Sequence, residues 1–311
     1  MPTAIYTHRE CRLHDMGAGH PECPQRLDAI ADQLIASGLD AALDHREAPL
    51  ATLEQLGRAH SLGYVLQMKD VLERLRDAGE RRAIDPDTVA CPDTWQAALR
   101  SAGAAVAATE AVVRGELDSA FCAVRPPGHH ATRDAAMGFC FFNNVAVAAR
   151  HALDVLGLQR VAIVDFDVHH GNGTEDIIAG DERVLMASFF QHPLYPGSGA
   201  CPKGTNMVNV PIPPYTRGAE IREVIEAMWL PRLEAFKPQM VFFSAGFDAH
   251  REDELGQLGL VEADYAWITQ RIKDIADRHA GGRIVSCLEG GYALSALGRS
   301  VVAHLRVLAD V

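Results

Sequence analysis

The sequence predicts an α/β fold in which helices cover both faces of a central, mostly parallel sheet. Short segments that are apolar throughout alternate along the chain with longer segments of helical periodicity. Strands buried on both faces have continuous apolar runs, and parallel strands need connecting helices between them. The 311 residues contain no repeat, low-complexity tract or flexible linker, so we expect a single domain over residues 1–311.

The expected strands are the short apolar runs. In chain order they are Thr3–Tyr6, Ser119–Val124, Arg160–Phe166, Val184–Phe189, Met240–Ser244 and Arg283–Leu288. The expected helices lie between them, at Pro24–Ser37, Thr94–Arg114, Asn143–Leu156, Arg217–Phe236, Glu262–His279 and Leu294–Leu308. The helix that starts at Thr94 is rich in alanine, which favours helix formation and close packing.

Composition and charge argue against several classes of protein. A net charge of −12 disfavours binding to a phosphate backbone. Solubility is the favoured explanation of this charge, and attraction of a cationic substrate toward the surface is the alternative. No apolar run would span a bilayer and the N-terminus lacks a signal-peptide pattern, so we expect a cytoplasmic protein without membrane or nucleic-acid partners. The seven cysteines are scattered without a CxxC pair, which argues against disulfides and a zinc–cysteine site.

Polar or glycine-rich segments follow four of the expected strands directly. They are RPPGHHA (125–131), the second half of VDFDVHHGNGTED (164–176), AGFDAH (245–250) and EGGY (289–292). In open α/β sheets, ligands bind outside the carboxyl ends of the strands. We therefore expect the four segments to meet in one functional site.

The second of these strands, Arg160–Phe166, ends in a candidate metal site. Asp165, Asp167 and His169 are spaced by two, so on a continuous strand their side chains would share one face. Buried charges there need a pairing partner or a cation. With Asp248 from another strand end, Asp167 and His169 would offer a divalent transition metal two carboxylates and one imidazole. The alternative is that Asp167 and Asp248 cap helices.

His129 and His130 form a candidate acid–base pair. Adjacent histidines can serve one reacting atom as acid and base if a partner fixes the other nitrogen of each ring. Asp165 and Asn172 are the expected partners, and the aspartate would raise the basicity of its histidine more than the asparagine would. The alternative is a pair of core histidines that bond to the backbone.

Tyr292 and a group of aromatic residues complete the candidate site. Tyr292 follows two glycines, which let the backbone approach a ligand, and its phenol would stabilise the oxyanion of a tetrahedral intermediate. The alternative is a tyrosine packed at a turn. Phe139 and Tyr195 are candidates for the walls of a slot for an aliphatic chain, whereas Phe141 and Phe142 are expected in the core. Together these features predict metal-assisted hydrolysis of an amide.

Six segments resemble the signature motifs of the histone deacetylase family. They are HPECPQRL (20–27), RPPGHHA, GFCFFNN, VDFDVHHGNGTED, SAGFDAH and LEGGY, and they occur in the family's order between residues 20 and 292. The resemblance is closest to class II and to bacterial deacetylase-like amidohydrolases. It implies an arginase-like fold with about eight strands and a catalytic zinc.

The resemblance also implies a role for each residue of the site. The zinc ligands would be Asp167, His169 and Asp248. His129 would have an electrostatic and acid role beside Asp165, and His130, beside Asn172, would be the base; Tyr292 would polarise the acetyl carbonyl.

Further residues follow from the same resemblance. Gly138, Phe139, Tyr195, Leu255 and Gly291 would bind substrate, although the family more often has phenylalanine at the position of Tyr195. Arg26 and Gly291 would lie near the exit route for acetate. A structural potassium ion would be held by Asp165, Ser188 and the backbone of Asp167 and His169. Asparagine at 172 fits class II, Tyr292 fits full deacetylase activity, and the lack of added domains fits a stand-alone bacterial enzyme.

The substrate is the open question. An acetylated lysine in a peptide or protein is favoured if Leu255 occupies the position where polyamine-preferring relatives carry a guarding glutamate. An acetylated polyamine is the alternative, because a shift of one residue would place Glu254 there. A two-metal ureohydrolase lacks its second ligand set, and a non-catalytic scaffold would have lost a ligand or the phenol. Zinc and ferrous iron both suit the ligands, and a homo-oligomer remains open.

Overall fold

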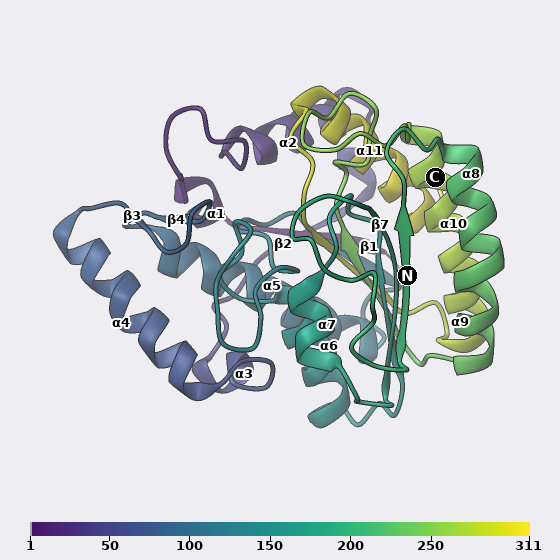
Figure 1. The fold of residues 1–311 in the computed structure, drawn as a ribbon, viewed down its shortest axis with the longest axis horizontal. Coiled ribbons are helices and arrows are strands. Elements are labelled where there is room, and N and C mark those ends of the chain that lie inside the picture. Colours follow the sequence, from purple (N-terminus) through teal and green to yellow (C-terminus); the bar gives the residue numbers. More distant parts are fainter. Residues whose placement is uncertain (1) are drawn as a thin grey trace.

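The computed structural model describes residues 2–311 and confirms the predicted α/β class (Figure 1). Its eight-stranded sheet has the order β2-β1-β5-β10-β9-β6-β7-β8, and every neighbouring pair is parallel. The strands are β1 Thr3–Thr7, β2 Asp44–Glu47, β5 Ser119–Cys122, β6 Val161–Asp165, β7 Val184–Gln191, β8 Met207–Ile212, β9 Val241–Ala245 and β10 Ile284–Leu288. A separate antiparallel pair joins β3 Arg82–Ala83 to β4 Val89–Ala90.

All six predicted strands are present, and the two edge strands β2 and β8 are additional. Strand β2 has the sequence DHRE, and its residues alternate between half-buried and exposed. Strand β8 contains Pro211, which a central strand would exclude because proline cannot donate to the ladder. Neither has the continuous apolar pattern of a central strand.

The six predicted helices are present with two differences. The predicted Arg217–Phe236 helix is α8 Gly218–Val224, a π-helical turn at Ile225–Trp229 and α9 Leu230–Phe236. Four helices lie outside the prediction: α1 Glu10–Leu13, α3 Leu53–Leu56, α4 Leu62–Ala78 and α7 Asn172–Ile178. The others are α2 Gln25–Ala36, α5 Thr94–Val113, α6 Asn144–Asp154, α10 Glu262–His279 and α11 Leu294–Leu308, with a 3-10 turn at Leu39–Ala42.

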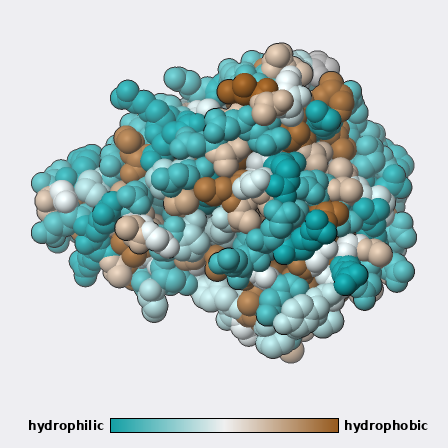
Figure 2. Space-filling view, turned by 90° about the horizontal axis from the view of Figure 1, so that it is seen from above, coloured by the Kyte–Doolittle hydropathy of each residue, from teal (hydrophilic) through white to brown (hydrophobic). Residues whose placement is uncertain are grey.

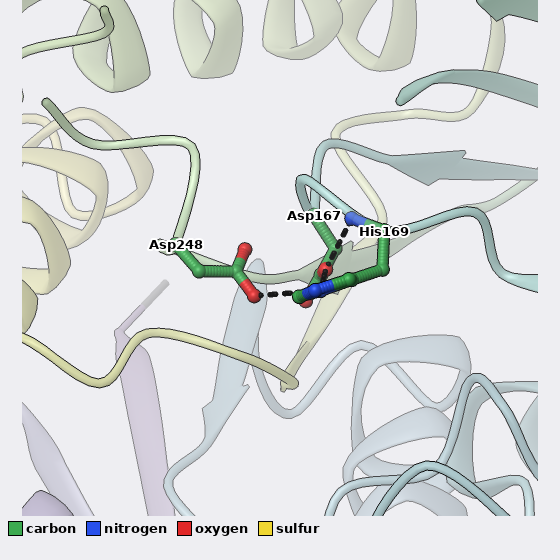
Figure 3. A group of neighbouring side chains, drawn as sticks. All are labelled: Asp167, His169 and Asp248. Atoms are coloured by element: carbon green, nitrogen blue, oxygen red, sulfur yellow. Dashed lines mark hydrogen bonds and ion pairs between the residues drawn. The ribbon is translucent and has the colours of Figure 1, made fainter. Parts of the chain in front are cut away.

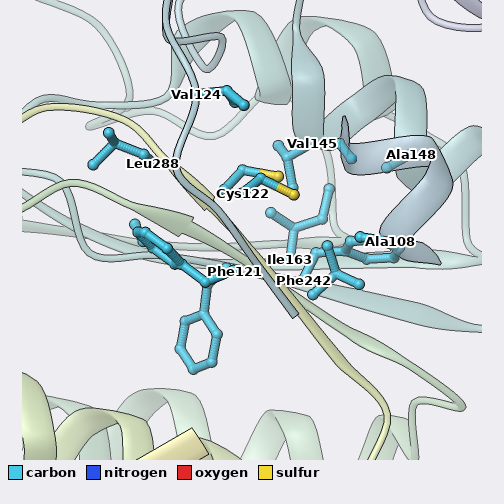
Figure 4. Close-up of a cluster of buried hydrophobic side chains, with 14 of the residues drawn as sticks. Ala108, Phe121, Cys122, Val124, Val145, Ala148, Ile163, Phe242 and Leu288 are labelled. Carbon is cyan, nitrogen blue, oxygen red and sulfur yellow. The ribbon is translucent and has the colours of Figure 1, made fainter. Parts of the chain in front are cut away.

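Two helix layers enclose the sheet. Helices α5 and α6 pack together on one face, and α2, α10 and α11 lie side by side on the other, while α4 extends from one end of the molecule (Figure 1). Successive residues of a strand serve opposite layers, so Phe121 and Cys122 of β5 lie on opposite sides of the sheet (Figure 4). Alanines such as Ala108 and Ala148 allow the helices to lie close to the strands. Phe141 and Phe142 are buried in this core, as predicted.

The surface carries apolar side chains singly rather than as one patch on the face shown in Figure 2. Over residues 2–311, no helix combines the length and the hydropathy that crossing a membrane requires.

The topology brings the four polar segments together. Strands β5, β10, β9 and β6 are neighbours in the middle of the sheet, and all are parallel, so the segments that follow them emerge at the same edge. One expectation about this edge is wrong. Strand β6 ends at Asp165 and the chain bends over residues 166–170, so residues 165, 167 and 169 do not lie along one continuous strand.

Candidate active site

Asp167, His169 and Asp248 converge at this edge. One donor atom from each residue lies within 4.8 Å of the others, and they form the one cluster of this kind among residues 2–311. Nδ1 of His169 lies 3.0 Å from Oδ1 of Asp167 and 3.1 Å from Oδ2 of Asp248. Figure 3 shows the imidazole approaching both carboxylates, which come from different strand ends.

Because no regular strand positions the candidate metal ligands, hydrogen bonds from backbone N–H groups orient their carboxylates. The N–H groups of Asp167 and His169 donate to Asp165 Oδ1 (3.1 Å) and Asp167 Oδ1 (2.8 Å). Asp248 Oδ1 accepts from Val168 N (2.9 Å), and Asp167 Oδ2 accepts from Gly290 N (2.9 Å). Each carboxylate is thus oriented by the bend after β6 or by the segment after β10.

Two glycines allow this close approach. A Cβ atom at Gly246 would lie 1.9 Å from Oδ2 of Asp167, and one at Gly290 would lie 2.1 Å from Oδ2 of Asp248. Both distances are far inside van der Waals contact, so any side chain at either position would displace a ligand oxygen.

The electrostatics of the cluster fit a divalent cation. Asp165, Asp167 and Asp248 are fully buried. Burial and the neighbouring charge of Asp167 raise the pKa of Asp248 to about 7. Burial alone would lower the pKa of His169, but hydrogen bonds to the two carboxylates outweigh it and raise that pKa to about 10. Carboxylates in excess of cations repel one another, and a divalent transition metal bound by the three donors would relieve the repulsion.

The tandem histidines lie beside this cluster in different environments. Nδ1 of His129 lies 3.0 Å from Oδ2 of Asp165, whereas Nδ1 of His130 lies 2.7 Å from Oδ1 of Asn172. Burial would lower the pKa of His129, but the charges of Asp167 and Asp165 raise it to about 10. Burial and the neighbouring His129 lower the pKa of His130 well below its ordinary value.

Glu289 fixes the segment that carries these histidines. Its carboxylate accepts hydrogen bonds from the N–H groups of Gly128 (2.6 Å) and His129 (3.0 Å), and Ser244 Oγ donates to its other oxygen (3.2 Å). Burial raises the pKa of Glu289 to about 7. The segment after β5, strand β9 and the segment after β10 therefore meet at one buried side chain.

A cavity of about 260 Å³ opens above the cluster. It is lined by Asp87, His130, Gly138, Phe139, His169, Leu194, Tyr195, Leu255 and Tyr292. The ring of Phe139 meets Tyr292 edge-on at 5.9 Å, and the ring of Tyr195 meets His130 edge-on at 5.1 Å. The predicted wall residues thus face a space that leads to the candidate metal ligands, and Leu255 lies on its wall.

Arg26 supports the segment that carries Tyr292. Its guanidinium donates to the carbonyl oxygens of Gly291 (2.7 Å) and Glu289, and it lies 4.9 Å from the centre of the Tyr292 ring. Glu22 pairs with both Arg26 and the buried Arg125. The HPECPQRL motif near the N-terminus is therefore connected to the last strand end.

Ser188 is the remaining residue of the predicted set. Ser188 is buried and lies directly beside Asp165 in the register of β7 with β6. His170 turns away from the site, and its Nε2 bonds to Glu175 (2.8 Å), so it is not available to a second metal.

Asp87 and Leu194 line the cavity but lie outside the predicted set. The turn Asp85-Pro86-Asp87 signals a loop in the sequence, but nothing local indicates what that loop approaches.

Comparisons with known proteins were consistent with this geometry. The family model described as histone deacetylase domain matches residues 20–308. The chain is 40% identical over 283 residues to the histone deacetylase-like amidohydrolase of Pseudomonas aeruginosa, covering 89% of this chain and 73% of the relative. It is 38% identical over 327 residues to the polyamine deacetylase HDAC10 of Mus musculus, covering 99% of this chain and 48% of that protein. A crystal structure of the HDA15 HD domain superposes with a TM-score of 0.92 at 34% identity, over 99% of this chain and 90% of that one.

Proposed function

Because the chain belongs to the histone deacetylase family, we propose that it is a zinc-dependent hydrolase that removes acetyl groups from the ε-amine of lysine in peptides or proteins. The observation that carries this proposal is the convergence of Asp167, His169 and Asp248, together with a cavity that His169, His130 and Tyr292 all line. These are the groups that amide hydrolysis requires.

The proposed metal ligands are Asp167, His169 and Asp248. A zinc ion held there would polarise the acyl carbonyl and lower the pKa of a bound water. Ferrous iron suits the same donors. We also propose a structural potassium site formed by Asp165, Ser188 and the backbone of Asp167 and His169, supported by the buried position of Ser188 beside Asp165.

The two histidines would divide the proton transfers between them. Asn172 Oδ1 can only accept a hydrogen bond, so Nδ1 of His130 carries the proton and Nε2 is free to take one from the attacking water. His129, beside Asp165, holds its proton and would stabilise the negative charge that develops. It would then donate a proton to the departing amine, which restores the neutral leaving group.

Tyr292 would donate a hydrogen bond from its hydroxyl to the carbonyl oxygen as that oxygen becomes negative. Burial and the charges of Asp248 and Asp167 raise the pKa of Tyr292 well above its ordinary value, so the hydroxyl keeps the proton that it donates. One such donor typically contributes about 10²–10³ in rate.

The cavity walls support lysine as the substrate. Phe139, Tyr195 and Leu255 offer an apolar passage to the methylene chain of an acetyl-lysine. Glu254 is exposed and is not among the residues that line this cavity. An acetylated polyamine is the second candidate, because one relative is named a polyamine deacetylase and Asp87 places a carboxylate on the cavity wall.

The test is kcat/KM of the zinc-reconstituted enzyme for an acetyl-lysine peptide and for an N-acetylated polyamine. We expect a peptide preference of about tenfold or more, which corresponds to about 1.4 kcal/mol in the transition state. Tyr292→Phe is the control, and it should lower both rates without changing the zinc content. A polyamine preference would reverse the substrate assignment. Turnover of neither substrate, with zinc bound, would refute the proposed activity.

A further inference from the structure

Asp253 connects two segments of the active-site rim. Its side chain is 6% exposed. Oδ2 accepts hydrogen bonds from the backbone N–H groups of Tyr292 (2.6 Å) and Ala293 (2.9 Å), and Oδ1 accepts one from the N–H of Leu255 (3.1 Å). One carboxylate thus bonds to the backbone N–H groups of two segments that are distant in the chain.

These two segments perform different tasks in the proposed reaction. Leu255 lies on the wall along which the substrate chain would pass, and Tyr292 carries the phenol that would meet the carbonyl. Both residues line the same cavity. A second hollow of about 260 Å³ lies on the other side of them, lined by Pro21, Glu252, Asp253, Glu254, Leu255, Tyr292 and Ala293. This hollow reduces the packing of the two segments on that side.

The rest of the segment from Glu289 to Ala293 is anchored elsewhere. Arg26 bonds to the carbonyl oxygens of Glu289 and Gly291, and Asp167 accepts from Gly290 N. At Tyr292 and Ala293 the backbone donors turn to Asp253 instead. Ala293 also precedes α11 and has no capping side chain of its own, so Asp253 supplies from a distance the acceptor that a helix start requires.

We propose that Asp253 is a positioning residue that fixes the backbone of Tyr292 and couples it to the cavity wall at Leu255. This inference rests on the proposed function, since it assigns Tyr292 its role in the reaction. Loss of the carboxylate frees both segments together, and the phenol no longer occupies a single position relative to the carbonyl.

Asp253→Asn tests the kinetic part. The amide keeps the volume and one acceptor oxygen, but its NH2 group must face the backbone N–H groups of one of the two segments, so it cannot accept from both. We expect kcat to fall by about 10- to 10²-fold, as for a catalytic group displaced by about 1 Å, with KM for a small acetyl-lysine substrate changed by less than about threefold. Asp264→Asn is the control, because Asp264 is equally buried at 6% and accepts from Val261 N (3.0 Å) at the start of α10, although it also pairs with Arg222 (2.6 Å). It should leave kcat within about twofold.

A double-mutant cycle separates positioning of Tyr292 from a general structural effect. If Asp253 acts through the phenol, Asp253→Asn should cost less than about threefold when added to Tyr292→Phe. Full multiplication of the two losses would overturn the proposal. Should Asp253→Asn not fold, Asp253→Glu keeps the two acceptors but moves them by one methylene, and it should show the same non-additivity with a smaller loss.

Hydrogen exchange tests the coupling without reference to activity. In Asp253→Asn, amide exchange should rise both in peptides covering residues 289–294 and in those covering 254–256, and Asp264→Asn should change neither. A rise in one segment alone, or in neither, would overturn the coupling. An inactive wild-type enzyme would refute the proposed function and leave this measurement to decide whether Asp253 joins the segments.

Discussion

His129 at the carboxyl edge of the sheet and His304 in the core beneath it are both almost fully buried, yet their pKa values shift in opposite directions. Burial lowers the pKa of His304 to about 3, where its ring nitrogens meet the hydroxyls of Thr269 (2.6 Å) and Ser286 (3.0 Å). His129 faces Asp165 and Asp167, and these carboxylates raise its pKa to about 10 against the effect of burial.

The two pKa values differ because the neighbouring side chains differ, not because one histidine is more deeply buried than the other. His60 behaves like His304: it bonds to the backbone of Thr132 and Asn143, and burial lowers its pKa to about 4. At the sheet edge, carboxylates are buried together without lysine or arginine as their direct partners. The interior thus accommodates neutral histidines as packing residues, whereas the edge attracts positive charge. This contrast is a physical reason to expect a cation there.

Removal of one of the edge carboxylates should have the largest effect. Asp248→Asn deletes a proposed metal ligand and reduces the negative charge that attracts the cation. We expect loss of bound zinc and a fall in kcat/KM of about 10³-fold or more. This fall corresponds to a loss of about 4 kcal/mol of transition-state stabilisation. Zinc content and activity measured on the same sample check this, with Asp264→Asn as a buried aspartate outside the three-donor cluster. Full zinc occupancy with normal activity would show that the three-donor assignment is wrong.

The second-largest effect on kcat should come from replacing a histidine at the sheet edge, whereas replacing a histidine in the core should have little effect on kcat. His130→Ala removes the proposed general base and should lower kcat by about 10²–10⁴-fold with zinc still bound. His304→Gln, in the core, should leave kcat of the folded enzyme within about threefold. Equal losses in the two variants would mean that His130 is itself a packing residue.

The core histidine should instead control stability at low pH. Its pKa of about 3 in the folded protein lies below the value of about 6.5 in an unfolded chain. The unfolded state therefore binds more protons between these values, so the stabilisation is complete above about pH 6.5 and is lost as the pH falls toward 3. Urea titrations at several pH values give the free energy of unfolding. Between about pH 3 and pH 6.5, its slope against pH should be smaller in His304→Gln than in the wild type, by about 1.4 kcal/mol per pH unit. Identical slopes would contradict this.

An exposed carboxylate near the rim should matter least. Glu254→Gln removes a charge of the same kind as those at the edge, but solvent and salt screen it. We expect kcat/KM for an acetyl-lysine peptide to change by less than about fivefold at physiological ionic strength. A larger loss confined to an acetylated polyamine would instead identify Glu254 as a contact of the distant ammonium.

The central part of the fold was predictable because its strands are buried on both faces and carry an uninterrupted apolar signal. The edge strand β2 has no such signal, since its DHRE sequence faces solvent at alternate residues. Helix α4 was predictable in principle: Ser61 Oγ accepts from Tyr64 N at its start, and Gly79, with φ +67°, ends it. Its mixed composition, with exposed Leu66 among charged residues, conceals the helical periodicity.

The proposed metal ligands and histidines stand at strand ends in the sequence, so their convergence followed from a parallel sheet alone. The contacts of Glu289 and Asp253 could not be predicted in this way. Both act on backbone N–H groups distant in the chain, 161 residues for Glu289 and Gly128, and every residue except proline offers such a donor. No pattern of residue types records that kind of contact, and only the folded geometry reveals it.

The position of β10 has a consequence for biosynthesis. This strand is the last of the sheet to leave the ribosome, yet it lies between β5 and β9 in its middle. Before residue 284 is synthesised, the nascent chain can form at most two half-sheets, each with an unpaired inner edge prone to association with other chains. The same insertion delivers Glu289, Gly290 and Tyr292 to the candidate active site. Completion of the sheet and assembly of the proposed site are thus one event late in translation, and a chain that stalls earlier would lack the proposed site and expose unpaired strand edges.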